Sequence, residues 1–318
     1  MPNTLVRVAA VTDETPAVRS LRLVREDGAP FEPYRAGAHI DVTGPTGVLR
    51  QYSLCGPPAD SSSLLIAVKR EAGSRGGSEA LHTLTEGDRL EIGEPRNLLS
   101  TAPDADRHVL VAGGIGITPL LSMAYQLHDD RACFELHYFA RSRAEAAFAD
   151  LLEHRAGFGD RVHLHFGVPR AGQPALLTGV ATGLGPASHV YTCGPAGFMD
   201  QVTRVFAPVV GDTHVHVEHF TAAEIDTSAD RPFTVELDTG EVYEVPAGRS
   251  ILSVLTDNGI DVFKSCEEGI CGSCVSGVLE GTPDHRDQCL SASDKAAGDQ
   301  LALCVSRALT GKLVIELY

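Results

Sequence analysis

The sequence lacks tryptophan, has few aromatic residues and is short of positive charge. No run of about 18 uninterrupted apolar residues occurs, so we expect no membrane span. The first residues lack a basic stretch followed by an apolar core, and we therefore expect no signal peptide and a cytoplasmic location. The 26 Lys and Arg residues are outnumbered by 42 Asp and Glu residues, which gives a net charge of −16. Such a chain cannot neutralise many phosphates, which argues against nucleic acid binding.

The 318 residues fall into segments with different patterns, which predict a multidomain protein. Residues 1–102 carry short alternating strands between Gly, Pro, Ser and Asp, as in an antiparallel barrel or sandwich. Strands and helices alternate in residues 103–222, which predicts an α/β domain with a parallel sheet. Residues 223–231 are polar and aperiodic, as in a linker, and residues 232–318 return to short strands around one short helix.

Five of the eight cysteines lie in the last fifth of the chain, which indicates metal or redox chemistry rather than disulfides in an intracellular protein. Four residues separate Cys266 from Cys271, two separate Cys271 from Cys274, and Cys304 follows after a further 29. This is the plant-type ferredoxin spacing, so these four cysteines are the candidate ligands of one [2Fe–2S] cluster.

Two glycines and a fifth cysteine accompany these ligands. Gly269 and Gly272 let the loop wrap closely, so that backbone N–H groups can approach the bridging sulfides. The spacing of Cys289 fits no ligand role, and we expect a structural thiol. Zinc and disulfide alternatives are weaker, because zinc sites usually need two Cys or Cys/His pairs and disulfides need an oxidising compartment.

A glycine-rich turn lies between an apolar strand at residues 108–112 and a helix at residues 119–127. Glycine lets a pyrophosphate approach the backbone N–H groups and the positive end of the helix dipole. A later strand ends at Cys193, Gly194 and Pro195, at the sheet edge where ligands bind. Alone, such a turn is also found as a simple connection beside a buried cysteine. The candidate residues of the first turn are Gly113, Gly114, Gly116, Thr118 and Pro119.

These signals occur in one order together with other short motifs, and the combination resembles a known family. Over essentially its whole length the chain resembles the phthalate dioxygenase reductase group of the ferredoxin–NADP reductase superfamily, which includes vanillate O-demethylase reductase components. The resemblance implies a flavin-binding antiparallel β-barrel, an α/β NAD-binding domain and an α+β β-grasp ferredoxin domain. The motifs that carry it are Arg50-x-Tyr52-Ser53-Leu54, Lys69-Arg70, Arg75-Gly76-Gly77-Ser78, Gly113 to Pro119, Cys193-Gly194-Pro195, Glu218-His219-Phe220 and Cys266 to Cys304.

The resemblance implies that residues 1–102 bind a flavin. Arg50 would pair with the flavin phosphate, a bidentate task suited to guanidinium. Tyr52 would pack on the isoalloxazine ring, and Ser53 would hydrogen-bond near flavin N5, where hydride arrives. The lack of an obvious adenine-binding extension favours FMN over FAD. The implied flavin set is Arg50, Tyr52, Ser53, Leu54, Lys69, Arg75, Gly76, Gly77 and Ser78.

The resemblance also implies where the nicotinamide binds. Thr118 and Cys193 would lie beside it, and Phe220 would shield the flavin until the nicotinamide displaces it. Ser53, Cys193 and Phe220 are therefore the candidate catalytic residues. The resemblance favours NADH over NADPH, although the two arginines in residues 141–143 offer positive charge for a 2′-phosphate.

One further group of side chains offers metal ligands. Alternation places His214, His216 and Glu218 on one face of a strand. Glu218 belongs to the family's Glu-x-Phe pattern, however, and ordinary strand residues explain the two histidines better than a metal site does.

The family resemblance implies an oxidoreductase that serves an oxygenase. Hydride delivers two electrons and the cluster accepts one at a time, so the flavin must act between NADH and the cluster. We expect a monomer that passes electrons to a terminal oxygenase of the Rieske type, an aromatic-ring dioxygenase or O-demethylase. A cytochrome P450 partner is one alternative, and a stand-alone flavin reductase is another that the cluster domain disfavours. Residues 233–318 hold 14 acidic and 6 basic residues, which favours docking on a basic partner surface.

Overall fold

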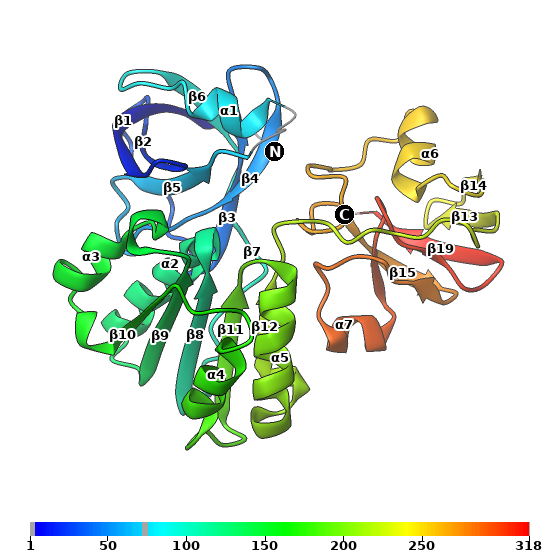
Figure 1. Cartoon of the computed structure of the whole chain (residues 1–318). Coiled ribbons are helices and arrows are strands. Elements are labelled where there is room, and N and C mark those ends of the chain that lie inside the picture. Colours follow the sequence, from blue (N-terminus) through cyan, green and yellow to red (C-terminus); the bar gives the residue numbers. More distant parts are fainter. Residues whose placement is uncertain (1–3, 72–75, 318) are drawn as a thin grey trace. The chain divides into compact units, whose positions relative to one another are not determined.

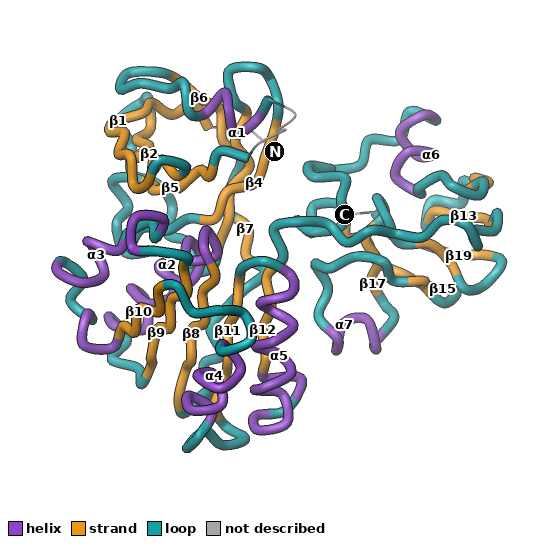
Figure 2. Tube along the Cα trace, in the orientation of Figure 1, coloured by secondary structure: helices purple, strands orange, loops and turns teal. Residues whose placement is uncertain are grey.

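The computed structural model describes residues 4–71 and 76–317. It divides the chain into two compact units, Met1–Glu218 (unit 1) and His219–Tyr318 (unit 2). Figure 1 labels the elements of both units, and Figure 2 shows the share of helix, strand and loop in each. The helices in the described ranges are too short or too polar to cross a membrane. The finer domain boundaries expected from the sequence stay predictions.

The first part of unit 1 is an antiparallel sheet of short strands. Its strand order in the described residues is β4-β3-β6-β1-β2-β5, with β7 paired to β3. Alternate side chains point inward, so that Val6 and Val8 of β1 and Leu21 and Leu23 of β2 are fully buried. The elements are β1 (Thr4–Thr15), β2 (Val18–Arg25), β3 (Ala38–Thr43), β4 (Leu49–Ser53), β5 (Leu64–Lys69), α1 (Gly77–Leu81), β6 (Arg89–Ile92) and β7 (Arg96–Asn97).

The second part of unit 1 is a parallel sheet in the order β10-β9-β8-β11-β12, as the alternation of strands and helices predicts. Leu110 packs towards α2 and α3 on one face, and Val109 packs towards α4 and α5 on the other. The order reverses between β8 and β11, which makes their carboxyl ends the switch point where such sheets bind ligands. The elements are β8 (Arg107–Gly113), η1 (Gly114–Gly116), α2 (Ile117–Asp129), β9 (Phe134–Ala140), η2 (Arg143–Glu145), α3 (Ala149–His154), η3 (Gly159–Arg161), β10 (Val162–Phe166), α4 (Gln173–Ala181), β11 (Ser188–Cys193), α5 (Ala196–Val210), η4 (Asp212–His214) and β12 (Val215–Glu218).

Unit 2 is a mixed sheet in the order β14-β13-β19-β15-β17. The turn between β13 and β14 is closed by the Leu237 N–H, which donates to the Glu241 carbonyl at 2.9 Å. Helix α6 begins where the Ser250 hydroxyl accepts from the Ser253 N–H, and its residue Leu255 is buried in the core of the unit. The elements are β13 (Phe233–Leu237), β14 (Val242–Val245), α6 (Ile251–Asp257), β15 (Val275–Glu280), β16 (Pro283–Asp284), α7 (Ala292–Ala297), β17 (Gln300–Ala302), β18 (Arg307–Ala308) and β19 (Lys312–Glu316).

Candidate functional site

Four cysteines of unit 2 meet although one of them is distant in sequence. Cys266, Cys271 and Cys274 lie on the loop between α6 and β15, and Cys304 follows β17. The Leu303 N–H donates to the Cys274 carbonyl at 3.1 Å, which places Cys304 beside the loop. The side chains of Cys266 and Cys271 hydrogen-bond to each other, as do those of Cys274 and Cys304. The four sulfur donors predicted from the spacing are thus brought together.

In each cysteine pair the shared hydrogen bond favours the thiolate of one partner and raises the pKa of the other partner, Cys266 or Cys304. The hydrogen bond from Cys266 lowers the pKa of Cys271 to about 5, and the hydrogen bond from Cys304 lowers the pKa of Cys274. Backbone N–H groups point at the sulfurs: that of Glu268 lies 3.3 Å from Cys266 Sγ, and that of Ser273 lies 3.5 Å from Cys271 Sγ. Iron binds the thiolate form, so this donor set fits a [2Fe–2S] cluster.

Glycine is required in this loop for steric reasons. Gly269 and Gly272 have φ of +75° and +72°, a backbone region that L side chains rarely adopt. A Cβ on Gly269 would also lie 2.6 Å from Cγ2 of Val305, the residue after the fourth candidate ligand. The two glycines therefore permit the tight wrapping that the sequence predicts.

The glycine-rich turn of unit 1 packs directly against the turn that ends β11. A Cβ on Gly116 would lie 2.1 Å from the Cys193 carbonyl oxygen, and one on Gly113 would lie 2.8 Å from the Phe198 ring. A Cβ on Gly194 would lie 3.0 Å from the Gly113 backbone. The structure therefore brings the two expected nucleotide motifs together at the switch point, in a contact that only glycine allows.

Helix α2 starts at this turn. Gly114 has φ of +57°, and Thr118 and Pro119 are buried in the first turn of the helix. The Thr118 hydroxyl donates to the Ile115 carbonyl at 3.0 Å, so it helps to hold the turn closed. The first N–H groups of a helix have no partner within it, and with the helix dipole they can bind a phosphate.

The expected flavin residues lie on β4 and at the start of α1. Arg50 and Tyr52 share one face of β4 by alternation, whereas Ser53 is on the other face and is buried. A Cβ on Gly77 would lie 3.1 Å from Arg50 Cγ, so Gly77 and Arg50 are neighbours. Leu54 is fully buried and belongs to the core of the sheet.

The remaining expected phosphate-binding residues surround α1. Gly76 precedes the helix with φ of +94°, and the Ser78 hydroxyl accepts from the Glu71 N–H at 3.2 Å. Lys69 Nζ lies 2.6 Å from Glu71 Oε1, so its charge is already paired. Arg75 lies outside the described residues.

Known proteins resemble this chain over its whole length. Residues 235–309 match the family of the 2Fe-2S iron-sulfur cluster binding domain. The chain is 41% identical over 322 residues to the vanillate O-demethylase oxidoreductase of Acinetobacter baylyi, with 100% of both chains covered. The chain belongs to the vanillate O-demethylase and phthalate dioxygenase reductase family. The solved phthalate dioxygenase reductase, described as a modular structure for electron transfer from pyridine nucleotides to [2Fe–2S], matches the reductase at 38% identity, with a TM-score of 0.70 and 99% and 98% coverage.

A second solved structure is a longer chain that the reductase covers only in part. It is an intact type IV self-sufficient cytochrome P450 monooxygenase, in which 41% of the chain matches 98% of the reductase at 36% identity and a TM-score of 0.90. Together these likenesses show that the reductase is an oxidoreductase. It combines a part that binds nicotinamide and flavin with a ferredoxin domain, as its motifs predict.

Sequence patterns assign no separate role to Glu218, which the structure places beside Cys193. The two residues are partners in the parallel pairing of β11 and β12. Burial raises the pKa of Glu218 to about 8 and raises the pKa of Cys193 well above its usual value. Glu218 Oε2 is buried and has no hydrogen-bond partner among the described residues. Phe220, which follows in unit 2, is 38% exposed, and its contact with a flavin stays a prediction.

His39 is a second residue that sequence reasoning missed. It is the cross-strand partner of Ser53 in the pairing of β3 and β4, so both side chains lie on the same face. Burial, assisted by the charge of Arg96, lowers the pKa of His39 to about 4, and its Nε2 has no partner among the described residues. Strand register is a long-range property, and no local motif signals this neighbour.

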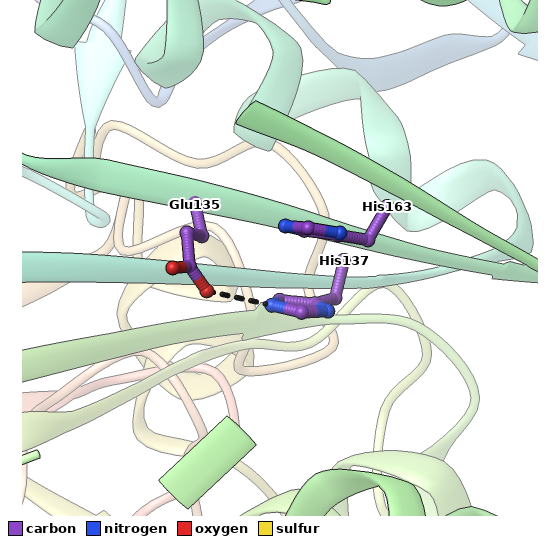
Figure 3. A group of neighbouring side chains, drawn as sticks. All are labelled: Glu135, His137 and His163. Carbon is purple, nitrogen blue, oxygen red and sulfur yellow. Dashed lines mark hydrogen bonds and ion pairs between the residues drawn. The ribbon is translucent and has the colours of Figure 1, made fainter. Parts of the chain in front are cut away.

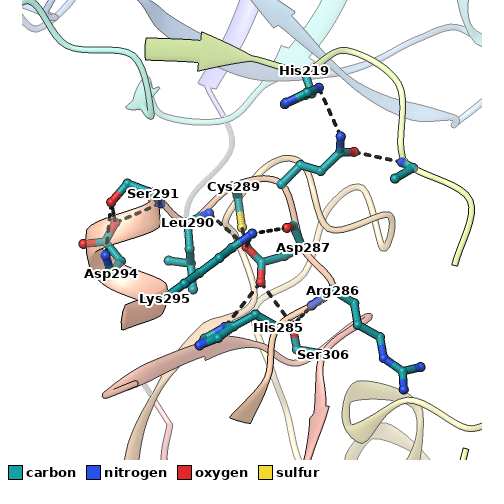
Figure 4. A network of polar contacts seen from close by, with 12 residues as sticks. His219, His285, Arg286, Asp287, Cys289, Leu290, Ser291, Asp294, Lys295 and Ser306 are labelled. Atoms are coloured by element: carbon teal, nitrogen blue, oxygen red, sulfur yellow. Dashed lines mark hydrogen bonds and ion pairs between the residues drawn. The ribbon is translucent and has the colours of Figure 1, made fainter. Parts of the chain in front are cut away.

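Cys289 is held by a buried carboxylate near the cluster loop. Its thiol lies 3.5 Å from Asp287 Oδ2. Burial is the largest cause of the raised pKa of this thiol, and the negative charge of Asp287 raises the pKa further. Asp287 also accepts from the Leu290 N–H at 2.9 Å and the Ser306 hydroxyl at 3.1 Å, and lies 3.7 Å from Lys295 Nζ (Figure 4). These contacts agree with the expected structural role of Cys289.

The histidines near the end of unit 1 bond to one another. His189 Nδ1 lies 2.8 Å from His216 Nε2, and the His214 ring stacks on the His189 ring with 4.1 Å between centroids. In the described part of the chain, His214, His216 and Glu218 do not form a group of converging metal ligands. Ring stacking and hydrogen bonding therefore account for these histidines.

Proposed function

We propose that the reductase carries electrons from NADH through FMN and one [2Fe–2S] cluster to a terminal oxygenase of the Rieske type. The observation that carries the proposal is the convergence of Cys266, Cys271, Cys274 and Cys304 in a chain that also joins two nucleotide motifs at a sheet switch point. Bound flavin would supply the conversion of a two-electron hydride into single electrons. The relatives' names support an oxygenase as the acceptor.

The proposed role of each side chain follows from its position in the fold. Arg50, beside Gly77, would hold the flavin phosphate, and Ser53 would orient the ring from the opposite face of β4. Cys193 and Glu218 keep their protons at neutral pH because burial raises both pKa values. They would therefore present a neutral surface to the nicotinamide ring. Backbone N–H groups at the start of α2 would bind its pyrophosphate.

Several contacts support the finer assignments. Arg141 and Arg143, the side chains offered for a 2′-phosphate, already pair with Glu145 and Glu153 at 3.5 and 2.6 Å, which favours NADH. A β-bridge joins Leu54, the residue after β4, to Ile66 of β5. This contact between the two terminal strands supports a flavin-binding sheet that curves into a barrel.

Cofactor analysis tests the proposed function. The purified reductase should contain about two irons per chain, and acid should release FMN. NADH should reduce the flavin faster than NADPH in stopped-flow absorbance, and the reduced protein should then pass electrons to a Rieske oxygenase. Release of FAD would show that the flavin is FAD and not FMN, and faster reduction by NADPH would show that NADPH is the electron donor. Reduction of a P450 in place of the Rieske protein would favour the second candidate partner, which the likeness to the self-sufficient P450 supports.

Ser53 and Arg50 should have separable effects in the flavin site. Ser53→Ala removes one hydrogen bond at the reacting end of the ring, so flavin reduction by NADH should slow by about tenfold with flavin affinity nearly unchanged. Arg50→Ala removes a charge-assisted contact with the phosphate and should weaken flavin binding by about 10–100-fold. Stopped-flow reduction and flavin titration measure the two quantities. Each variant is the control for the other, and interchanged effects would reverse the assignment.

A further inference from the structure

A cluster of histidines and one carboxylate occupies the edge of the parallel sheet in unit 1. Glu135 and His137 alternate on β9, and His163 lies opposite His137 on the edge strand β10. Val109 and Val111 of β8 are in register with Glu135 and His137 and pack towards α4 and α5. On this face of the sheet these side chains of β8 are apolar, whereas β9 and β10 place side chains of metal-ligand type there.

The ligand atoms of this cluster lie at separations that suit one metal ion. Glu135 Oε2 is 3.2 Å from His137 Nε2, and one ligand atom from each of the three residues lies within 4.8 Å of the others. Two atoms bound tetrahedrally to Zn²⁺ at about 2.0–2.1 Å are about 3.3 Å apart. The His163 ring is stacked on the His137 ring with 4.6 Å between centroids (Figure 3). His163 is exposed, so its ring is free to tilt towards the other two ligands.

The surroundings prepare His137 as a ligand. The His137 side chain is buried, so contacts with its neighbours hold its ring in place. His165 Nε2 lies 3.2 Å from His137 Nδ1, which can fix the tautomer that leaves Nε2 for a metal. Arg107 pairs with Oε1 of Glu135, so the carboxylate is oriented while Oε2 faces His137.

We propose that Glu135, His137 and His163 bind a divalent transition-metal ion of the zinc class, with water in the remaining position. Two imidazole nitrogens and one carboxylate oxygen are ligands that Zn²⁺ accepts, whereas Mg²⁺ and Ca²⁺ prefer oxygen alone. The ion ties the edge strand β10 to β9. The site is separate from the cysteine loop, because it lies in unit 1 and contains no sulfur. A hydrogen-bonded chain from Glu135 through His137 to His165, without metal, is the competing explanation.

Zinc binding to the intact protein tests the proposal. The full-length reductase, with flavin and iron–sulfur cluster bound, is equilibrated with Zn²⁺, freed of excess metal and analysed for zinc. X-ray absorption at the zinc edge should show nitrogen or oxygen ligands at about 2.0–2.1 Å and no sulfur at about 2.3 Å. One zinc per chain with this signature supports the site. Zinc with sulfur ligands would show that the metal has entered the cysteine loop, and it would overturn the proposal.

Variants locate the ion. His163→Ala removes an exposed ligand on the edge strand and should lower zinc affinity by about 100-fold or more, since loss of an outer partner alone costs about 10–100-fold. Glu135→Gln should also weaken binding. His154→Ala, which changes an exposed histidine of α3, is the matched control and should bind zinc as the unaltered protein does. Unchanged NADH-dependent flavin reduction in His163→Ala shows that the unit is folded.

The competing hydrogen-bonded chain predicts different results. If the unaltered protein retains no zinc, or if His163→Ala and His154→Ala retain it equally, no metal binds at Glu135, His137 and His163. Either result overturns the proposal whether or not the reductase transfers electrons from NADH.

Discussion

Replacing Cys304 by serine is expected to remove the electron paramagnetic resonance signal of the reduced cluster, while NADH still reduces the flavin. Cys304 is the only candidate ligand contributed from outside the loop, and the Leu303 N–H fixes its place beside Cys274. Without its thiolate, one iron loses a protein ligand, and the cluster is lost or severely damaged. Iron content and the resonance signal report the cluster, and stopped-flow absorbance reports the flavin.

Cys289→Ser is the matched control for this experiment. Cys289 is also a partly buried thiol of unit 2, but it is bonded to Asp287 and has a raised pKa. The variant should retain the full iron content and the same signal. If the cluster survives in Cys304→Ser and disappears in Cys289→Ser, the two cysteines have been assigned the wrong way round.

Gly116→Ala is expected to slow reduction of the flavin by NADH by about 100-fold and to destabilise unit 1. The added Cβ would lie 2.1 Å from the Cys193 carbonyl oxygen, so one of the two turns must move. Overpacking of this kind costs about 3 kcal/mol in the free energy of unfolding. A displacement of about 1 Å at a reacting site costs about 100-fold in rate, and each of the two turns belongs to the expected nucleotide site. Thermal unfolding and stopped-flow reduction measure the two effects.

Gly179→Ala provides the comparison for Gly116→Ala. Gly179 lies in α4, and a Cβ there would meet no atom within 4 Å. Alanine favours the helix, so this variant should be as stable as the parent or more stable by about 0.5–1 kcal/mol. If the two variants have the same thermal stability and the same rate of flavin reduction, the close contact of Gly116 with Cys193 places no constraint on the nucleotide site.

Local sequence patterns predicted the elements that depend on local chemistry. The spacing of the cysteines predicted that Cys304 would join the loop, and the glycine-rich turn predicted a strand, a tight turn and a helix. The alternation of strands and helices does not predict where α3 begins: the segment between β9 and β10 is not one continuous helix, because Phe148 adopts φ of +62° and α3 begins only at Ala149. Helix α4 was not expected, since its small and β-branched residues give little amphipathic signal.

Neighbours that depend on strand register could not be predicted. His39 meets Ser53, and Glu218 meets Cys193, only because particular strands pair in a particular alignment. A shift of one residue would turn each side chain to the other face of its sheet. The same holds for His137 and His163, which are distant in sequence and come together through the pairing of β9 and β10.

The position of Cys304 has a consequence for how the cell makes this protein. Its thiol reaches the loop only when β17 has paired with β15 and the Leu303 N–H has bonded to Cys274. Loading of iron and closure of this edge of the sheet are therefore linked, and bound metal adds its binding free energy to folding. Cells starved of iron should accumulate chains in which β17 is unpaired and open to proteases. Iron supply in the growth medium would then set the amount of intact protein, and not only the fraction that is active.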